Sequence, residues 1–256
     1  MMTQDDMNIL VPEKLSEIER EQGITVLYAA ESGSRAWGFE SPDSDFDVRF
    51  IYKRPQSEYL RLNASRDVIE LPINDTWDVS GWDLDKALRL LMKSNPAQYE
   101  CLSSPICYMD RGFPVRISPL LPEYFSPSKM LYHYLSMTRN NIRSCFEGDT
   151  VRLKRYLYIL RSLLACLWVM EYDAPPPVKF ADMAGRMLPE SLKPSLEYLL
   201  AEKVKSSEKS EIPRLPDIDS FIESSVSRTQ LYVETLHERP KSWDALNEFF
   251  IREISQ

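Results

Sequence analysis

The chain is poor in the residues that hold transition metals or form redox motifs. Its 256 residues include only two histidines and four cysteines. The histidines, His133 and His237, stand far apart, and the cysteines show none of the spacings typical of zinc or redox motifs (Cys101, Cys107, Cys145 and Cys166). We therefore expect no zinc site, and we expect the thiols to be reduced, as is usual in the cytoplasm.

Long apolar runs are also lacking. The longest apolar stretch, near Leu163 to Met170, is far shorter than the ~20 residues that cross a bilayer. The chain does not open with a basic segment followed by an apolar one, so we expect no secretory signal. With 43% hydrophobic and 27% charged residues, the composition is typical of globular proteins. We expect a cytoplasmic protein without a membrane partner and leave its oligomeric state open.

Positive charge is scarce overall, and it is concentrated in one segment. The net charge is −8, yet residues 125–170 hold seven Lys or Arg against two Asp or Glu. An acidic chain argues against tight non-specific binding to long nucleic acids, which requires many phosphate contacts. A local basic face suits a triphosphate or a short stretch of RNA backbone.

Glycine is rare as well, with seven in the chain, and one of them stands in the most informative segment. An apolar strand is predicted over Thr25 to Ser32, and Gly33-Ser34 follow it directly. Glycine allows a backbone to approach a ligand closely, and a helix that begins at such a turn directs N–H groups at anions. Gly33 and Ser34 are therefore candidate phosphate ligands.

Two acidic residues at a spacing of two follow this turn. Asp45 and Asp47 lie in a predicted strand that alternates with Phe46 and Val48. Residues two apart in a strand point to the same face, so the two carboxylates should lie side by side and repel each other. A divalent cation relieves that repulsion, and Mg²⁺ is commonly held by one or two carboxylates together with substrate phosphates. The pattern predicts an Mg²⁺ or Mn²⁺ site that works with a nucleoside triphosphate.

In this order, these motifs resemble the nucleotidyltransferase core of the DNA polymerase beta superfamily, and more narrowly its RNA-repair-associated, RlaP-like family. The matching segments run from about residue 24 to about residue 200, and they read GSRAWGFESPDSDFDVRFIY, DVIELP, GWDLDKALRLLMKSNP, FSPSKMLYHYLSM and RLKRYLYILRSLLACLW. The resemblance implies transfer of a nucleoside monophosphate from a triphosphate to an acceptor, with release of pyrophosphate.

The resemblance also implies a third carboxylate for a two-metal arrangement. The first choice is Asp83, which matches the acidic residue before the family's helix. Glu70 is the second choice and Asp67 the third. Asp83 has an alternative role as the N-cap of the helix that follows it.

Cationic residues near these motifs are candidates for nucleotide binding. Arg35 and Arg49 are close to the motifs in sequence, although Arg49 shares a face with Asp45 and Asp47 and could simply pair with one of them.

A second group of candidates lies in a predicted helix over 151–172. Lys154, Tyr158 and Arg161 form one stripe of this helix that could close over a triphosphate, and the family segment K-R-Y-L-Y-x-L-R supports that role. A solvated basic face is the alternative. Trp37 could stack on a base or belong to the core.

The order of the elements predicts an α/β (α+β) fold: a small mixed sheet backed by helices, followed by a helical domain. Further strands are predicted over Asp67 to Ile73 and Trp77 to Leu84, then a helix that ends before Pro96, and a connector over 105–127. We predict two domains, residues 1–124 and 125–256.

The leading hypothesis is a metal-dependent nucleotidyltransferase that acts on an RNA end, a protein side chain or a small molecule. The alternatives are a non-catalytic nucleotide-binding regulatory module and an interaction protein, for instance a partner in a toxin system.

Overall fold

The computed structural model describes residues 2–41, 44–63, 65–72, 76–143, 148–205, 210–238 and 240–256. The chain divides into two compact units, and each is described here by itself. The sheet unit comprises residues 1–36, 45–125 and 240–256, and the helical unit comprises residues 37–44 and 126–239. Both units are therefore discontinuous in sequence, whereas the division into 1–124 and 125–256 stays a prediction.

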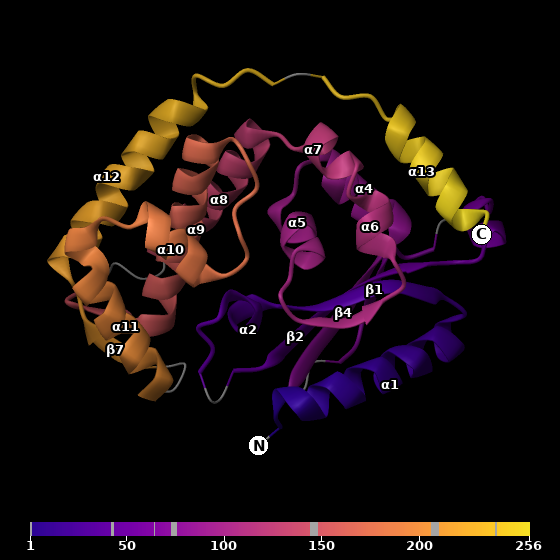
Figure 1. Cartoon of the computed structure of the whole chain (residues 1–256), viewed down its shortest axis with the longest axis horizontal. Helices are drawn as coiled ribbons and strands as arrows, with labels where there is room; N and C mark the ends of the chain where they lie inside the picture. Colours follow the sequence, from indigo (N-terminus) through magenta and orange to yellow (C-terminus); the bar gives the residue numbers. More distant parts are fainter. Residues whose placement is uncertain are drawn as a thin grey trace. The chain divides into compact units, whose positions relative to one another are not determined.

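A five-stranded mixed sheet forms the centre of the sheet unit (Figure 1). Its strands lie in the order β3-β4-β2-β1-β5. β2 and β4 run parallel, and the other neighbours are antiparallel. The strands are β1 (Thr25–Ser32), β2 (Phe46–Lys53), β3 (Val68–Glu70), β4 (Trp77–Asp83) and β5 (Cys107–Asp110). This sheet confirms the predicted fold class.

One face of the sheet is covered by α1 (Gln4–Gln22) (Figure 1). Met7, Val11, Leu15 and Ile18 of this helix are buried in one apolar cluster with Phe46, Val48 and Phe50 of β2. Thr3 and Asp6 form a capping box at its start, and Gly23 ends it in the left-handed conformation. Pro12 therefore lies inside the helix, eight residues after its first residue.

The other face carries short helices that include α4 (Leu84–Met92), α5 (Pro96–Leu102) and α6 (Phe113–Ile117). The predicted connector over 105–127 is wrong, because it contains β5, α6 and α7 (Leu120–Tyr124). Pro114 lies in the first turn of α6, where a missing N–H costs nothing, so proline there does not indicate a loop. The predicted strand residue Ile73 lies outside the described residues.

The last helix, α13 (Asp244–Ile254), belongs to the sheet unit. The Arg116 guanidinium donates to both carboxylate oxygens of buried Glu253, at 2.8 and 2.9 Å, and Lys53 Nζ donates to the Glu253 carbonyl at 2.6 Å. Phe249 packs edge-on against Phe113. Local sequence patterns identify this helix, but these partners lie far from it in sequence.

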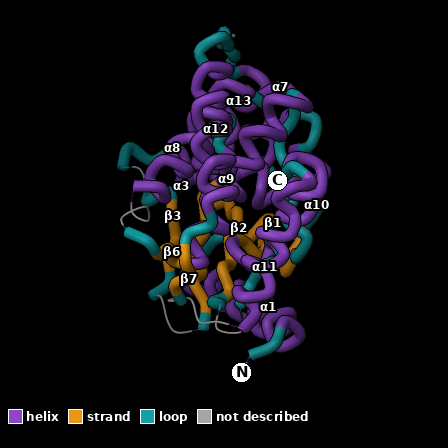
Figure 2. Tube along the Cα trace, turned by 90° about the vertical axis from the view of Figure 1, so that its left-hand side faces the viewer, coloured by secondary structure: helices purple, strands orange, loops and turns teal. Residues whose placement is uncertain are grey.

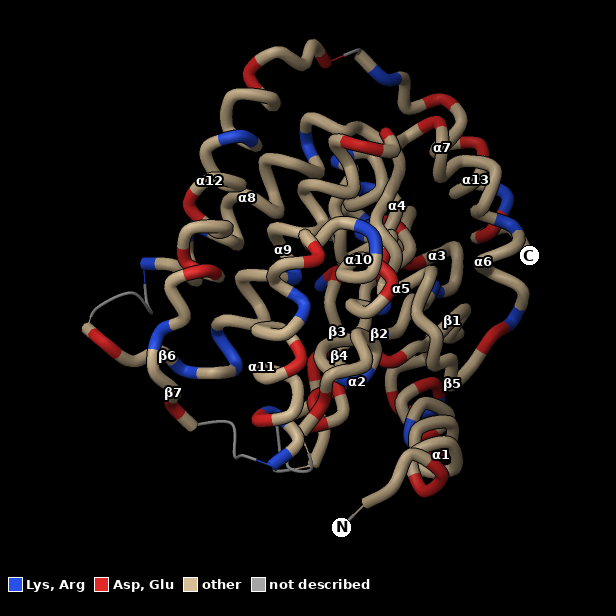
Figure 3. The backbone as a smooth tube through the Cα atoms, turned by 60° about the vertical axis from the view of Figure 1, so that its left-hand side comes forward, with Lys and Arg blue, Asp and Glu red and all other residues tan. Residues whose placement is uncertain are grey.

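The helical unit is built around α9 (Leu153–Tyr172), whose inner positions are almost all buried. Helix dominates this unit (Figure 2). The other helices of this unit are α8 (Pro127–Arg143), α10 (Phe180–Met187), α11 (Lys193–Lys205) and α12 (Pro216–Val233), with a 3-10 turn at Glu190–Leu192. Two short antiparallel strands also belong to this unit: β6 (Thr150–Arg152), between α8 and α9 in the chain, and β7 (Glu211–Pro213), between α11 and α12. Blue segments, which mark Lys and Arg, lie near these strands in Figure 3. The short helix α3 (Gln56–Tyr59) belongs to the sheet unit. None of the described helices is long and apolar enough to cross a membrane.

The Arg116–Glu253 pair gives a test of how α13 is held. Arg116→Met leaves the Glu253 carboxylate, which is 1% exposed, without its cation, and we expect the free energy of unfolding to fall by about 3 kcal/mol. The control is Arg66→Met, which breaks the exposed Arg66–Glu70 pair and should cost less than about 1 kcal/mol. Urea unfolding of both variants measures the difference. Equal losses would show that Glu253 does not depend on Arg116.

Candidate active site

Three polar residues form a row across the sheet unit. Asp47 on β2 is the register partner of Ser32 on β1 and of Asp78 on β4. Directly paired residues point to the same face, so the three side chains lie next to one another on the face opposite the α1 cluster. The row brings a second strand's carboxylate to the D-x-D motif.

Gly33 lies directly against the Asp47 carboxylate. A Cβ on Gly33 would lie 2.0 Å from Asp47 Oδ2, closer than any non-bonded contact allows. Gly33 also has φ of +63°, in the left-handed region that favours glycine. Gly33 and Asp47, fourteen residues apart in the chain, therefore bring the glycine–serine turn and the D-x-D strand together at one point, and that contact requires the absence of a side chain.

Buried Glu31 holds the backbone of Asp47 in place. Its Oε1 accepts a hydrogen bond from the Asp47 N–H at 2.8 Å, and its Oε2 accepts one from the Tyr108 hydroxyl. Burial raises the pKa of Glu31 to about 7, because the charged carboxylate loses its hydration. Glu31 was not among the sequence-predicted site residues. Its side chain is on the α1 face, so it positions Asp47 from behind the row.

Arg49 joins the two acidic strands. Its Nη2 lies 2.8 Å from Asp78 Oδ2 and 3.7 Å from Asp47 Oδ1, and its Nη1 donates to the Asp78 carbonyl at 3.2 Å. The side chains of all three residues are between one fifth and one third exposed, so the group is accessible to a ligand. The ion pair that the sequence left open as an alternative for Arg49 is present, and its main partner is Asp78.

The other motif residues lie next to the start of β2, which is the place of Asp45, and in α2 (Gly33–Trp37), which contains Ser34 and Arg35. Asp45 immediately precedes the strand and is exposed. Its carbonyl accepts a hydrogen bond from Arg35 Nε at 3.2 Å, and the Arg35 guanidinium stacks on the Phe46 ring at 3.8 Å. Ser34 is buried in α2, directly after Gly33. Arg35 thus ties the helix after the glycine–serine turn to the first acidic residue.

The structure does not bring Asp83, the first choice for the third carboxylate, to this row. Asp83 is five residues beyond Asp78 on β4, roughly 16 Å along the strand. It is the register partner of Tyr52, which places it on the α1 side of the sheet. Its carboxylate accepts hydrogen bonds from the Tyr59 hydroxyl at 2.9 Å and the Asp85 N–H at 3.1 Å, so it caps α4. Burial raises the pKa of Asp83.

The two other choices are also elsewhere. Glu70 lies on β3, which pairs with the far side of β4, and it forms an exposed ion pair with Arg66. Asp67 pairs with Lys86 at 3.4 Å. β3 does not neighbour β2 in the sheet, and Asp67 lies just before β3, so neither carboxylate is a register partner of Asp47.

The acidic residues of the row, together with Asp45, fit a divalent cation in their chemistry. Asp45, Asp47 and Asp78 offer carboxylate oxygens, the donors that Mg²⁺ prefers. Within the described ranges, however, no three His, Cys, Asp or Glu side chains are already arranged as a metal cluster. Arg49 takes the position between the two strands' carboxylates, and it would have to turn aside to admit an ion there.

Residues 37–41 belong to the helical unit and are held by its helices α9 and α11. The Arg161 guanidinium, 2% exposed, stacks over the Trp37 ring at 3.9 Å, and Tyr158 packs edge-on against the same ring. Phe39 contacts Tyr158, and Lys203 Nζ donates to Ser41 Oγ at 2.9 Å. Arg161 and Tyr158 therefore serve as anchors for this segment.

The third residue of the predicted stripe is Lys154. Its Nζ lies 5.5 Å from the centroid of the Tyr158 ring. Contact of Lys154, Tyr158 and Arg161 with a triphosphate stays a prediction.

The residue that sequence reasoning missed is Asp78. The predicted strand over Trp77 to Leu84 contained both Asp78 and Asp83, and their odd spacing places them on opposite faces. Trp77 and Val79 share the parity of Asp83, and Ser80 shares that of Asp78, so the first four residues of the strand favour a polar face for Asp78, although Trp82 breaks this pattern.

One family model and one curated relative match almost the whole chain. The family model described as "RNA repair pathway DNA polymerase beta family" (RlaP) matches residues 7–252. The chain is 38% identical over 247 residues to the uncharacterized protein YcgL of Bacillus subtilis (strain 168), with 95% of each chain covered.

A search of solved structures found a nucleotidyltransferase-like protein from Exiguobacterium sibiricum 255-15. The match has a TM-score of 0.31 and 12% identity, and it covers 87% of this chain and 74% of that one. A TM-score this low carries no functional inference.

Two glycines with the same backbone conformation separate the contact with Asp47 from backbone strain. Gly33 and Gly23 have φ of +63° and +62°, but a Cβ at Gly23 would meet no atom within 4 Å. We expect Gly23→Ala to cost about 1–2 kcal/mol of unfolding free energy. Gly33→Ala should cost a further 1–3 kcal/mol or so, because the Asp47 carboxylate must move. Denaturant unfolding checks this, and equal costs would mean that Asp47 does not lie against Gly33.

Proposed function

Because this chain belongs to the RNA repair pathway DNA polymerase beta family, we propose that it is a metal-dependent nucleotidyltransferase whose site is centred on Asp47 and Asp78. The substrate would be a nucleoside triphosphate, and the products a nucleotidylated acceptor and pyrophosphate. The observation that carries the proposal is the contact of Gly33 with the Asp47 carboxylate, beside an in-register carboxylate on the neighbouring parallel strand. This contact joins a candidate phosphate seat to a candidate cation site.

In the proposed reaction, the acceptor oxygen forms a bond to the α-phosphorus. The bond from that phosphorus to the oxygen bridging the α- and β-phosphates breaks, its electron pair leaves with pyrophosphate, and the acceptor hydroxyl releases its proton to solvent water. Asp45, Asp47 and Asp78 would hold Mg²⁺ or Mn²⁺, which when bound lowers the pKa of the acceptor hydroxyl and offsets the charge of the leaving pyrophosphate.

The chain's own groups would bind and orient the triphosphate. Gly33 holds the glycine–serine turn against Asp47, so a phosphate bound at this turn would lie near the cation, and the Ser34 hydroxyl would donate to its oxygens. Arg49 would exchange its carboxylate partners for phosphate oxygens, and Arg35 would keep the start of β2 in position through the Asp45 carbonyl. Such positioning and charge neutralisation supply most of the rate enhancement in phosphoryl and nucleotidyl transfer.

The family's description supports an RNA end as the acceptor, and a protein side chain or a small molecule are the other acceptors to be tested. A cytoplasmic location and the choice of Mg²⁺ over Mn²⁺ belong to the same proposal. The overall charge of −8 favours a short contact with RNA over binding along a long strand.

Three isosteric variants test the proposed site. We expect Asp47→Asn and Asp78→Asn each to lower Mg²⁺-dependent pyrophosphate release by more than about a hundredfold, because each removes a charge that would bind the cation. Asp83→Asn is the control, since Asp83 lies on the opposite face and amide oxygen still caps α4, and its turnover should stay within a few-fold of the wild type.

Pyrophosphate release from each of the four triphosphates, with a pool of RNA, protein and small-molecule acceptors, measures these effects. Undiminished turnover of Asp78→Asn would remove Asp78 from the site. Loss of turnover in Asp83→Asn, with folding intact, would show that Asp83 is the third carboxylate of the site.

One observation favours a second function, a nucleotide-binding module without turnover. Arg49 pairs with the carboxylates that would hold the cation, and a guanidinium there could bind phosphate without any metal. Thermal-shift measurements distinguish the two functions. A triphosphate that raises the melting temperature equally with and without Mg²⁺, and more weakly in Arg49→Met, would support the module.

A further inference from the structure

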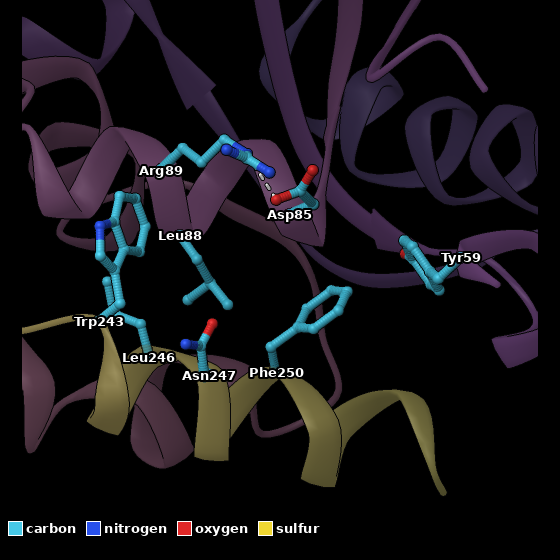
Figure 4. A pocket seen from close by; sticks show the side chains of 8 residues that line it. All are labelled: Tyr59, Asp85, Leu88, Arg89, Trp243, Leu246, Asn247 and Phe250. Atoms are coloured by element: carbon cyan, nitrogen blue, oxygen red, sulfur yellow. Dashed lines mark hydrogen bonds and ion pairs between the residues drawn. The ribbon is translucent and has the colours of Figure 1, made fainter. Parts of the chain in front are cut away.

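A cavity separate from the Asp47 row lies between α4 and α13 of the sheet unit (Figure 4). Its volume of about 370 Å³ falls within the range of small-molecule sites. The lining residues come from both helices and from α3: Tyr59, Asp85, Leu88, Arg89, Trp243, Leu246, Asn247 and Phe250. Asp85 follows Asp78 by seven residues, past the end of β4, so the cavity is remote from the proposed site of nucleotidyl transfer.

The helix that forms one wall is firmly attached. Besides the Arg116–Glu253 pair, the Tyr124 hydroxyl donates to the Ser242 carbonyl at 2.8 Å, just before α13. Phe250 packs edge-on against Tyr59, with ring centroids 5.0 Å apart. The helix that bounds the cavity is thus held at both ends by contacts within the sheet unit, which keep this wall of the cavity in place.

The apolar part of the lining suits a flat ligand. Leu88 and Leu246 are buried, and the rings of Trp243 and Phe250 stand on the same side of α13, facing α4 in Figure 4. Trp243 is 44% exposed, although an indole is among the most favourable groups to cover. A planar aromatic ligand would stack on these rings.

The polar part of the lining favours an uncharged ligand with both donors and acceptors. Arg89 Nε donates to Asp85 Oδ1 at 2.7 Å, so these two charges balance each other. The Asn247 amide points toward α4 in Figure 4, and in the described parts of the chain its side chain has no hydrogen-bond partner. An amide can donate and accept at once, and it pairs in this way with the edge of a nucleobase.

A second, smaller cavity suggests where a sugar would lie. It measures about 140 Å³ and shares Tyr59 and Asp85 with the first. Its other lining residues are Arg54, Glu58, Arg61, Ser65, Asp67 and Asp83. The carboxylates of this cavity outnumber its two guanidinium groups, so it favours a ribose, whose hydroxyls donate to carboxylate oxygens, over a phosphate. The combination of a stacking surface, an amide and hydroxyl acceptors matches a nucleoside.

We propose that the cavity between α4 and α13 binds an uncharged nucleoside, with its base between Trp243 and Asn247 and its ribose toward Asp85. The nucleoside is either free or the terminal residue of a single-stranded RNA that carries free ribose hydroxyls. This site does not depend on the proposed transferase activity, because it shares no residue with the Asp47 row.

The test follows the signals of the Asn247 side-chain amide and the Trp243 indole N–H in the full-length, ¹⁵N-labelled protein. Adenosine, guanosine, cytidine and uridine are added singly, followed by the 5′-monophosphate of the strongest binder. We expect saturable shifts of both signals with at least one nucleoside and weaker binding of its monophosphate. A trinucleotide that ends in the same nucleoside then separates the sources: tighter binding assigns the site to an RNA end, and weaker binding to a free nucleoside.

Variants at exposed positions keep the fold and remove the proposed contacts. Trp243→Ala and Asn247→Leu should each weaken nucleoside binding by at least about fivefold, since one removes the stacking surface and the other the amide. Tyr132→Ala and Asn8→Leu are the matched controls, because both residues lie outside the cavity and should leave binding unchanged. Asp47→Asn should also leave it unchanged, which keeps this test apart from that of the transferase site.

Three results would overturn the proposal. One is the absence of shifts with every nucleoside at 10 mM or so, a concentration well above the ~1 mM dissociation constant of a weak site. Another is unaltered binding by both cavity variants. The third is equal binding of N-acetyltryptophanamide, which would show that any flat aromatic group enters and that the Asn247 amide does not select a base.

Discussion

The contact between Gly33 and the Asp47 carboxylate is the constraint on which the candidate site depends. A side chain at Gly33 would occupy the space of Asp47 Oδ2, so the glycine–serine turn and the D-x-D strand can meet only because this residue has no Cβ. Strand register then adds Ser32 and Asp78 to the same face, and buried Glu31 fixes the Asp47 N–H from the other side. Local geometry and long-range pairing thus converge on one carboxylate.

Electrostatics explains how this group of acids is stable in the protein itself. Like charges on neighbouring strands destabilise a sheet, and Arg49 compensates by pairing with Asp78 and approaching Asp47. The same guanidinium would compete with a cation for these oxygens. In the proposed function, Arg49 therefore has two sets of partners, carboxylates in the free protein and phosphates in the complex.

Much of this could be predicted from sequence, and the limits have physical causes. The mixed sheet, the Gly33–Ser34 turn and the Asp45–Asp47 pair depend on local patterns, and the fold class and family are confirmed. Asp78 meets Asp47 through the parallel register of β2 and β4, which no local pattern reveals, so the sequence led to Asp83, Glu70 and Asp67 as candidates and not to Asp78. In the same way, nothing within α13 indicates that its partners are Arg116 and Lys53. The helix stripe of Tyr158 and Arg161 was recognised, but its contact with Trp37 links segments more than a hundred residues apart.

The most direct measurement is the anomalous diffraction of Mn²⁺ in crystals of the protein grown with a non-hydrolysable triphosphate. We predict a manganese peak within coordinating distance of Asp47 and Asp78 oxygens, roughly 2.0–2.3 Å, with Arg49 turned toward the phosphates. A peak at Asp83 would contradict the assignment of the third carboxylate. A triphosphate bound at Gly33 without any manganese peak at Asp47, and with Arg49 still paired with Asp78, would contradict the proposal that Asp47 and Asp78 hold the cation.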